Sequence, residues 1–295
     1  MNLEPLIYWV RAREAIRIRK EAGEMGPLTD DSILATYRFC NVRREDDRVT
    51  KWIDEKIRQR YADHHHLWFM LCAARMINWP FALADLIDES RPGPASRLYP
   101  NAWPDCPSFS PAALGDAMED RASMGLKVFT GAYVIPAPGK GETKGRFLGQ
   151  KVLGQLWRER ARFESHFNSK PTMRSTHQLL TKYDFWGPFL AYQAIVDMRF
   201  THLLRDAEDT QTWCAAGPGT IRGLNRLHGR KLDHALPQHQ AMQECRDIYQ
   251  TIQQDTGVTM DFSDVPNILC ETDKYLRVKN KEGTPRALYV PGRGA

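Results

Sequence analysis

The sequence predicts a mainly α-helical protein with a small loop and strand insertion in its middle. Three observations lead to this fold class. Apolar residues recur at helical spacing in most segments of the 295-residue chain. No segment alternates apolar and polar residues between turn signals over the length of a half-buried strand. Proline and glycine concentrate in two central stretches, 89–111 and 136–145, where they predict loops.

The predicted helices follow one another along the chain. The first covers residues 1–20 and has arginines along its polar side. The second covers 30–42, where a capping acid precedes apolar residues at helical spacing. The best strand candidate is 127–135, which is β-branched and aromatic. The remaining helical segments share the same apolar periodicity and cover residues 48–61, 66–77, 151–167, 185–204 and 239–254.

Domain organisation follows from the same pattern. We expect an N-terminal helical part over 1–90, a Pro/Gly-rich insertion over 91–150 and a C-terminal helical part over 151–295. Neither an internal repeat nor a heptad stretch is visible in the sequence. The three parts are expected to form a single compact unit.

Composition excludes several classes of protein. Apolar residues make up 42% of the chain, enough for a packed core, and no apolar run approaches the roughly 18 residues that span a bilayer. Glu4 and the lack of a small-residue cleavage site argue against a signal peptide. The net charge of +5 and the pI of about 8.8 permit nucleic-acid binding without requiring it.

Cysteine and histidine spacing predicts neither a metal site nor a cofactor. The six cysteines form no CxxC pair, which excludes the usual zinc and iron–sulfur patterns and predicts reduced, buried thiols in a cytosolic chain. The triplet of His64, His65 and His66 lacks matching ligands nearby in the sequence and is interpreted as incidental. The cysteines are Cys40, Cys72, Cys106, Cys214, Cys245 and Cys270.

Three familiar catalytic patterns are missing. The stretch "PGKGETKG" carries glycine and lysine but does not match the G-x-x-x-x-G-K-[ST] loop of phosphate-binding kinases. The G-x-S-x-G nucleophile elbow is absent from the sequence, and no Cys/His nucleophile pair stands out. This chain is therefore not expected to be a kinase of that type.

A Gly-Pro-Gly turn in "CAAGPGTIRGLNRL" is the first candidate binding site. A helix-hairpin-helix uses such glycines because its backbone turns sharply and approaches a DNA phosphate, to which the next helix presents unpaired N–H groups. The expected DNA-contacting residues are Gly217, Gly219, Thr220, Arg222 and Arg226. Such contacts position the protein and read no base sequence. The alternative is a plain corner between two helices.

Asp264 in "TMDFSDVPNILCETDKYLRV" is the candidate catalytic residue. Helix-hairpin-helix DNA glycosylases place an aspartate after the hairpin, at the start of a helix, and Pro266 fits a first helical turn. The simpler interpretation is that Asp264 only caps this helix. Polar residues then recur at helical spacing, as Asn267, Glu271 and Lys274 on one face and as Cys270, Asp273 and Arg277 on another.

A cationic segment in "TYRFCNVRREDDRVTKWI" is the third candidate. If it is helical, one stripe carries Tyr37, Arg38, Asn41, Arg44 and Arg48. Arginine grips phosphate or pyrophosphate bidentately, and Asp46 and Asp47 would orient the arginines. The alternative is an exposed helix rich in ion pairs.

Several stretches together resemble one known family. They are "RFCNVRREDDRVTKWI", "FTGAYVI", "YDFWGPFLAYQAIVDM", "AAGPGTIRGLNRLHGR" and "CETDKYLRVKNKEGTPRALYVPGR". They look like the phage α-glutamyl/putrescinyl thymine pyrophosphorylases, also called amino acid:DNA transferases, which are akin to the helical domain of 5-hydroxymethyl-deoxyuridine DNA kinases. The resemblance runs from Tyr8 to Arg293. It implies a helix-hairpin-helix, DNA-glycosylase-like helical fold.

The resemblance also implies a reaction. A transferase of this kind displaces pyrophosphate from the 5-methylene carbon of pyrophosphorylated 5-hydroxymethyluracil in double-stranded DNA, using the amine of an amino acid or polyamine. It would work in the cytoplasm of the infected bacterial host. The matching residues are Asn41, Arg43, Arg44 and Asp47 in the first motif, Tyr192 and Gln193 in the middle one, and Asp264, Asn267, Glu271, Asp273 and Lys274 in the last.

These residues predict a division of labour. The target nucleotide must leave the stack, and Tyr37, Phe185 or Trp186 would then stack on its base. Cationic side chains would stabilise the departing pyrophosphate, while Asp264 or Glu271 takes the proton of the amine or orients its ammonium form. The cationic candidates are Arg38, Arg43, Arg44 and Lys274.

Two other functions remain open from the sequence. One is a DNA glycosylase that excises a modified pyrimidine, which would leave abasic sites without any amine donor. The other is a non-catalytic DNA-binding helical module of a hydroxymethyl-uracil DNA kinase system, which would bind DNA without turnover. The identity of the amine does not follow from the spacing of these residues.

Overall fold

The computed structural model describes residues 1–87, 99–131, 139, 141–285 and 287–289. Within these residues the chain is mainly helical, which confirms the predicted fold class at this level. The only β-type pairing described there is an isolated antiparallel bridge between Tyr37 and Leu288. The predicted strand is therefore wrong over 127–131, and its remainder lies outside the described residues.

The helices divide between two compact units. Unit 1 combines Met1–Arg48 with Gln211–Ala295, and unit 2 is Val49–Thr210. The second unit is thus an insertion between the two halves of the first along the sequence. The three-part division at residues 90 and 150 stays a prediction.

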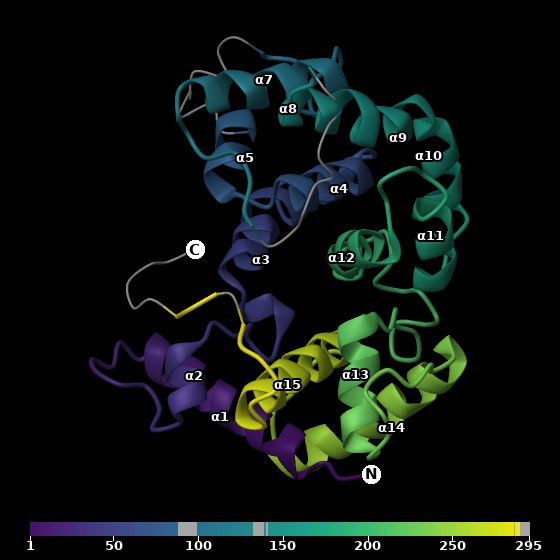
Figure 1. The fold of residues 1–295 in the computed structure, drawn as a ribbon. Coiled ribbons are helices and arrows are strands. Elements are labelled where there is room, and N and C mark those ends of the chain that lie inside the picture. The colour runs from purple at the N-terminus through teal and green to yellow at the C-terminus, as the bar shows by residue number, and fades with distance from the viewer. Residues whose placement is uncertain (88–98, 132–138, 140, 286, 290–295) are drawn as a thin grey trace. The chain divides into compact units, whose positions relative to one another are not determined.

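Unit 1 is organised around its last helix, α15, which packs against α1, α13, α14 and α2 (Figure 1). The core of this unit contains buried apolar side chains from several of these helices, among them Leu6, Trp9, Leu224, Ile248 and Leu269. The helices of this unit are α1 (Glu4–Glu21), α2 (Ser32–Thr36), α13 (Pro218–Leu227), α14 (Gln238–Thr256) and α15 (Val265–Lys279).

Asp31 joins three of these helices. One of its carboxylate oxygens accepts hydrogen bonds from the Ile33 and Leu34 backbone N–H groups at 2.8 and 3.0 Å, so it caps α2 as the sequence predicts. The other oxygen accepts from the hydroxyls of Tyr8 on α1 and Tyr275 on α15, each at 2.7 Å. The start of α2 is thereby fixed to both neighbouring helices.

Unit 2 has α4 (Leu67–Ile77) at its centre. Every residue of this helix is buried, and α12 (Pro188–Met198) and α5 (Pro80–Ile87) pack against it. Arg75 on α4 donates to both carboxylate oxygens of Asp197 on α12 and to the Thr50 hydroxyl at 2.9 Å, so the buried charges compensate each other. The ring of Trp68 on α4 stacks on the ring of Phe163, with a distance of 4.3 Å between the ring centroids.

The helical elements between Arg48 and Met198 are three to 13 residues long. They are α3 (Arg48–Ile53), a π-helical turn (Asp54–Arg58), α4 (Leu67–Ile77), α5 (Pro80–Ile87), α7 (Pro111–Ser123), α8 (Lys144–Arg146), a second π-helical stretch (Phe147–Leu153), α9 (Gly154–Arg158), α10 (Arg160–Asn168), α11 (Met173–Leu180) and α12 (Pro188–Met198). Most predicted helices are present, whereas the one over 185–204 is shorter than expected because turns follow Met198. In the part of the chain that is described, no helix combines the length and apolar character needed to cross a membrane.

Candidate active site

Asp264 lies at the junction between a short 3₁₀ turn, Phe262–Asp264, and α15. Its carboxylate accepts hydrogen bonds from the backbone N–H groups of Arg44 at 2.8 Å and Asp261 at 2.9 Å. It makes no side-chain cap bond to α15 itself, but its bond with the Asp261 N–H is part of a capping box on the preceding 3₁₀ turn. The side chain also ties the segment around residue 44 to the start of α15.

Burial gives this carboxyl an unusual titration. Asp264 is only 4% exposed. Desolvation raises its pKa from the ordinary 3.8 to about 7, against the opposing effect of the two backbone N–H groups. The group therefore exchanges a proton near neutral pH, which is the range that a general base needs.

One face of α15 continues the contact that Asp264 begins. The Asn267 side-chain amide faces the Asn41 carbonyl at 3.5 Å, and Glu271 accepts from the Cys40 backbone N–H at 2.9 Å. Lys274, one turn later, pairs with Glu271 at 2.6 Å. Residues 264, 267, 271 and 274 share this face because they recur every three or four positions. The face predicted from the sequence thus holds the backbone of residues 40–44.

Helix α1 holds the same segment from its own side. The Arg13 guanidinium donates to the Cys40 carbonyl at 2.9 Å and to the Asn41 side-chain oxygen at 2.7 Å. Asn41 in turn donates to the Asp46 carbonyl at 2.8 Å. The segment that carries the candidate arginines is therefore fixed by both α1 and α15.

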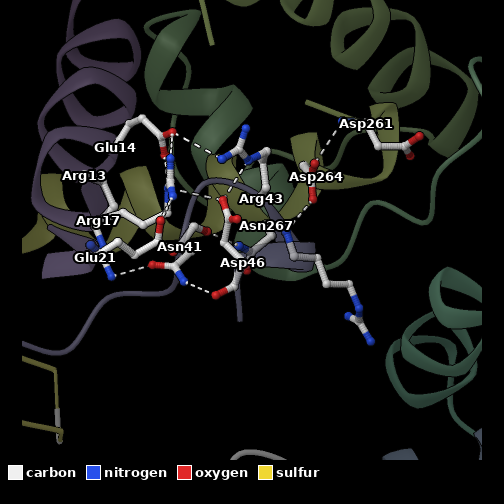
Figure 2. Close-up of polar contacts among 11 residues, drawn as sticks. Arg13, Glu14, Arg17, Glu21, Asn41, Arg43, Asp46, Asp261, Asp264 and Asn267 are labelled. Atoms are coloured by element: carbon white, nitrogen blue, oxygen red, sulfur yellow. Dashed lines mark hydrogen bonds and ion pairs between the residues drawn. The ribbon is translucent and has the colours of Figure 1, made fainter. Parts of the chain in front are cut away.

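An arginine and carboxylate cluster occupies the α1 side (Figure 2). Glu14 is 7% exposed and accepts from Arg17 at 2.6 and 2.9 Å. Arg43 donates to Asp46 at 2.6 Å and to Glu14 at 3.4 Å. Arg17 also pairs with Glu21. Hydrogen bonds from Arg17, opposed by burial, lower the pKa of Glu14, so the cluster keeps this carboxylate ionised.

The cationic stripe expected over residues 36–53 is wrong as a single helical face. Helix α2 ends at Thr36, and Tyr37 is extended with φ −106° and ψ 148°. The Arg38 backbone N–H instead donates to the Ala287 carbonyl at 3.1 Å. The segment therefore leaves the helix to pair with a distant part of the chain. Arg38, Asp47 and Arg48 have exposed side chains, whereas Arg44 is half-buried.

The Gly-Pro-Gly turn opens α13, with Gly217 at its N-cap. The described residues before it, 199–217, form turns and irregular chain, so the helix expected ahead of the turn is not present as a regular α-helix. A Cβ at Gly219 would meet the Cys270 sulfur at 2.3 Å, and one at Gly223 would meet the Leu269 carbonyl oxygen at 2.5 Å. These two glycines let α13 pack closely on α15.

Gly217 differs from those glycines. A Cβ built there would meet no atom within 4 Å. Thr220, the other small residue of the turn, is buried and donates to the Pro266 carbonyl at 3.0 Å. Within the predicted DNA-contacting set, Gly217 is therefore the glycine whose backbone has open space around it.

Asp273 pairs with both arginines of α13. Arg222 lies at 3.1 Å and Arg226 at 2.5 Å from its carboxylate, and Arg226 also donates to Glu282 at 3.1 Å. Asp273 is buried, and the side chain of Arg226 is only 8% exposed. Asp273 therefore fixes α13 to α15, and Arg222 is the more exposed of the two arginines.

The middle motif and two stacking candidates belong to unit 2. Tyr192 is buried and Gln193 half-buried on α12. Trp186 is buried and donates to the Val152 carbonyl at 3.2 Å. Phe185 is 41% exposed, has φ 68° and packs edge-on against Phe147 at 4.9 Å. The residues of the first motif, around Asn41, and of the last motif, from Asp264 to Lys274, belong to unit 1. The middle motif, Tyr192 and Gln193, belongs to unit 2.

The contribution of α1 to the site does not follow from the sequence pattern. Arg13, Glu14 and Arg17 all contribute contacts to the site, yet only a generally arginine-rich polar side was predicted. The signal was present in "RAREAIRIRK", where Arg13 and Arg17 lie one turn apart with Glu14 between them. Such spacing is equally typical of solvent-exposed ion pairs.

The histidine triplet lies in unit 2. The ring centroids of His64 and His65 are 4.7 Å apart, and those of His65 and His66 are 3.8 Å apart. Burial, followed by the other two imidazoles, lowers the pKa of His66 to about 4. Over the residues that the structure describes, no group of three or more His, Cys, Asp or Glu side chains is placed to hold a metal ion.

Comparison with known proteins places these observations in a family. The profile of the family described as "5-hmdU DNA kinase, helical domain" matches residues 2–284. The 5-hmdU DNA kinase of Bacillus phage SP10 is 24% identical over 216 residues, which are 68% of this chain and 32% of the kinase. The match thus spans about a third of that relative's length. No solved structure matches the chain.

Proposed function

This chain belongs to the family of 5-hmdU DNA kinase helical domains, and from that premise we propose that it modifies hydroxymethylated thymine bases in phage DNA. The finer proposal is an amine transfer. The nitrogen of a neutral amine attacks the 5-methylene carbon of a pyrophosphorylated 5-hydroxymethyluracil, and the carbon–oxygen bond breaks. Pyrophosphate leaves with the bonding electrons, and the amine loses one proton. The setting is the cytoplasm of the infected host.

A single observation carries this proposal. Asp264, whose pKa is about 7, is bonded directly to the backbone of the arginine-bearing segment inside one compact unit. This supports the proposal because the candidate base is attached to the segment that carries the candidate cations. At neutral pH a substantial fraction of Asp264 is ionised and able to accept the proton.

Cationic side chains of residues 38–44 and of α15 would stabilise the leaving group. Arg38 is exposed on the segment, Arg43 is 30% exposed, and Lys274 lies beside Glu271 on the facing helix. Preorganised positive charge at the position of a developing anion is usually the largest contribution to catalysis. Arg44, Asn41, Asp47 and Asn267 complete the proposed pyrophosphate-binding set.

DNA would be held through its backbone. Pro218 has no backbone N–H, so the N–H groups at the start of α13 are those of Gly219 and Thr220, and a Cβ at the neighbouring Gly217 would meet open space, which supports a phosphate contact. Flipping the target nucleotide costs a few kcal/mol. Tyr37, which is half-buried and belongs to the same unit as Asp264, is the proposed stacking partner for the everted base.

Phosphoryl transfer is not proposed for this chain. Its sequence carries no G-x-x-x-x-G-K-[ST] loop, and the kinase relative is matched over about a third of its length. The proposed reaction would instead follow phosphorylation of the same base position.

A second candidate is a DNA-recognition module without catalysis. Both oxygens of Asp264 already accept backbone hydrogen bonds, and Glu271 accepts one from Cys40. These bonds favour a role in building the segment around residues 40–44. Such a module would bind DNA equally well when Asp264 no longer titrates.

The deciding experiment uses DNA that carries pyrophosphorylated 5-hydroxymethyluracil, an amino-acid pool and nucleoside mass spectrometry. The parent is expected to form an amine-bearing nucleoside. Asp264→Asn, which keeps one acceptor oxygen, should reduce transfer by about 10²-fold or more while DNA affinity changes only a few-fold. Asp206→Asn is the matched control because this aspartate is highly exposed in unit 2.

Each other outcome has a definite meaning. Equal transfer by Asp264→Asn and the parent rules out Asp264 as the base. Abasic sites formed without any amine indicate a glycosylase. Tight DNA binding by a folded parent with neither product indicates the recognition module.

A further inference from the structure

Residues 287–289, which we name the C-terminal strap, pair with the segment that follows α2 in unit 1 (Figure 1). The backbone N–H of Tyr289 donates to the Thr36 carbonyl at 2.9 Å. The backbone N–H of Arg38 donates to the Ala287 carbonyl at 3.1 Å. The strap is therefore bonded directly to the backbone of Arg38, one of the candidate cations.

The strap adds a third hold on the segment that carries these cations. Residues 40–44 are bonded to both α1 and α15. Helix α2 has already ended, so residues 37–39 belong to no helix, and the strap supplies the partner of the Arg38 N–H. Tyr289 of the strap also lies within electrostatic range of Arg13 on α1, which itself holds residues 40 and 41. The strap thus lies beside the part of the segment that the helices leave open.

The pairing of the strap is small. It contains one antiparallel bridge, between Tyr37 and Leu288. Leu288 is 59% exposed and Tyr289 is 36% exposed, so the strap buries little apolar surface. Two-stranded pairing of this kind is marginal in water without further packing. Loss of one of its hydrogen bonds should therefore change the fraction of time for which Arg38 is held.

We propose that the C-terminal strap is a positioning element of the proposed active site and holds Arg38 in place for the departing pyrophosphate. This inference rests on the proposed function, in which Arg38 is one of the cations that stabilise the leaving group. Positive charge stabilises a developing anion best when it is already in place before the bond breaks. The strap itself touches no substrate and acts through the backbone of residue 38.

Amide hydrogen exchange of the full chain tests the hold on Arg38. Tyr289→Pro removes the N–H that donates to Thr36 and should speed exchange at the Arg38 N–H roughly three- to tenfold. The Cys40 N–H, which donates to Glu271, is the internal reference and should exchange as in the parent. Unchanged exchange at Arg38, or an equal acceleration at Cys40, would overturn the proposal.

Leu288→Pro is the matched control for the effect of proline itself. Leu288 lies between the two hydrogen-bonded positions of the strap, so its N–H points away from residues 36–38. Both substitutions place proline in the same extended segment. Leu288→Pro should leave exchange at Arg38 at the rate of the parent. Acceleration as large as that in Tyr289→Pro would contradict the role given to the Tyr289 N–H.

The transfer assay tests the positioning role. Tyr289→Pro should lower kcat roughly fivefold or more with little change in the KM for DNA, because the lost contribution belongs to the transition state. Tyr289→Phe keeps the backbone N–H and should transfer like the parent. In an Arg38→Gln background, Tyr289→Pro should lower kcat by less than about twofold, since the charge that it positions is gone. Equal losses in both backgrounds would show that the strap does not act through Arg38.

The two measurements separate this inference from the proposed function. If the parent transfers an amine and Tyr289→Pro keeps the parent's kcat, the positioning role fails and the function stands. If the parent transfers no amine while Tyr289→Pro still speeds exchange at Arg38, the transferase proposal fails and the strap is shown only to hold residue 38.

Discussion

Asp264 combines a structural contact with a raised pKa. It holds two chain segments through backbone hydrogen bonds, and it still keeps a proton near neutral pH because water is excluded around it. Burial raises the pKa of Asp264 and so makes it a candidate base. Burial also means that ionisation of Asp264 destabilises the folded state.

The pH dependence of stability follows from this pKa. The folded-state value of about 7 lies above the ordinary 3.8, so between these values the folded chain binds a proton that the unfolded chain has lost. The contribution of Asp264 to stability is therefore fully present below about pH 4 and is lost as pH rises to about 7. Between pH 5 and pH 8 this loss should amount to roughly 2–3 kcal/mol.

Denaturant unfolding of Asp264→Asn at these two pH values measures the effect. The variant cannot titrate at this position, so its unfolding free energy should fall less than that of the parent. Asp206→Asn should keep the parent's pH dependence because its side chain is highly exposed. Parallel curves for Asp264→Asn and the parent would show that residue 264 does not titrate in this range.

Helix α13 depends on two glycines for its contact with α15. Replacing Gly223 by Ala would drive a methyl group into the Leu269 backbone, which cannot rotate away as a side chain can. We expect a net loss of about 1–3 kcal/mol, even after the better helix propensity of alanine is counted. Thermal unfolding of Gly223→Ala measures this loss.

Gly217→Ala provides the matched comparison. Its Cβ would enter open space and its φ of −79° suits any residue, so stability should change by less than about 1 kcal/mol. Reduced DNA affinity in this stable variant would support a phosphate contact there. Equal destabilisation by both substitutions would contradict the close packing of α13 on α15. Gly219 is a poorer probe because its variants would clash with Cys270.

Periodicity identified most helices but placed the end of α2 wrongly. The helical pattern continues to Val42, yet the chain leaves the helix after Thr36. The Thr36 carbonyl accepts a hydrogen bond from the backbone N–H of Tyr289 at 2.9 Å, so this part of the chain pairs with a segment near its other end. A partner so far along the sequence leaves no trace in a local pattern, and tertiary contacts outweigh local propensity.

The site was predictable only in part, because it too depends on contacts between residues that are far apart in the sequence. Spacing alone places Asp264, Asn267 and Glu271 on one face of α15. It does not reveal that this face contacts backbone groups of residues 40–44. Glu14 and Arg17 are three positions apart and therefore resemble an ordinary surface ion pair, although Glu14 is buried.

At the scale of the whole molecule, unit 2 is a continuous segment with a core of its own. Trp68 stacks on Phe163, and Arg75 pairs with Asp197 within that unit. We therefore expect a fragment of residues 49–210 to be helical by circular dichroism and to unfold cooperatively on heating. Loss of helical signal, or a gradual transition without a midpoint, would show that the fragment needs the rest of the chain.

The division of unit 1 into two sequence-distant halves has a consequence for biosynthesis. Helix α1 leaves the ribosome early, but α14 and α15, against which it packs, are translated only after all of unit 2. During that interval the nascent N-terminal segment must remain without these partners, and unit 2 is free to fold ahead of it. The order of synthesis therefore delays assembly of the Asp264 region until α15 has been made.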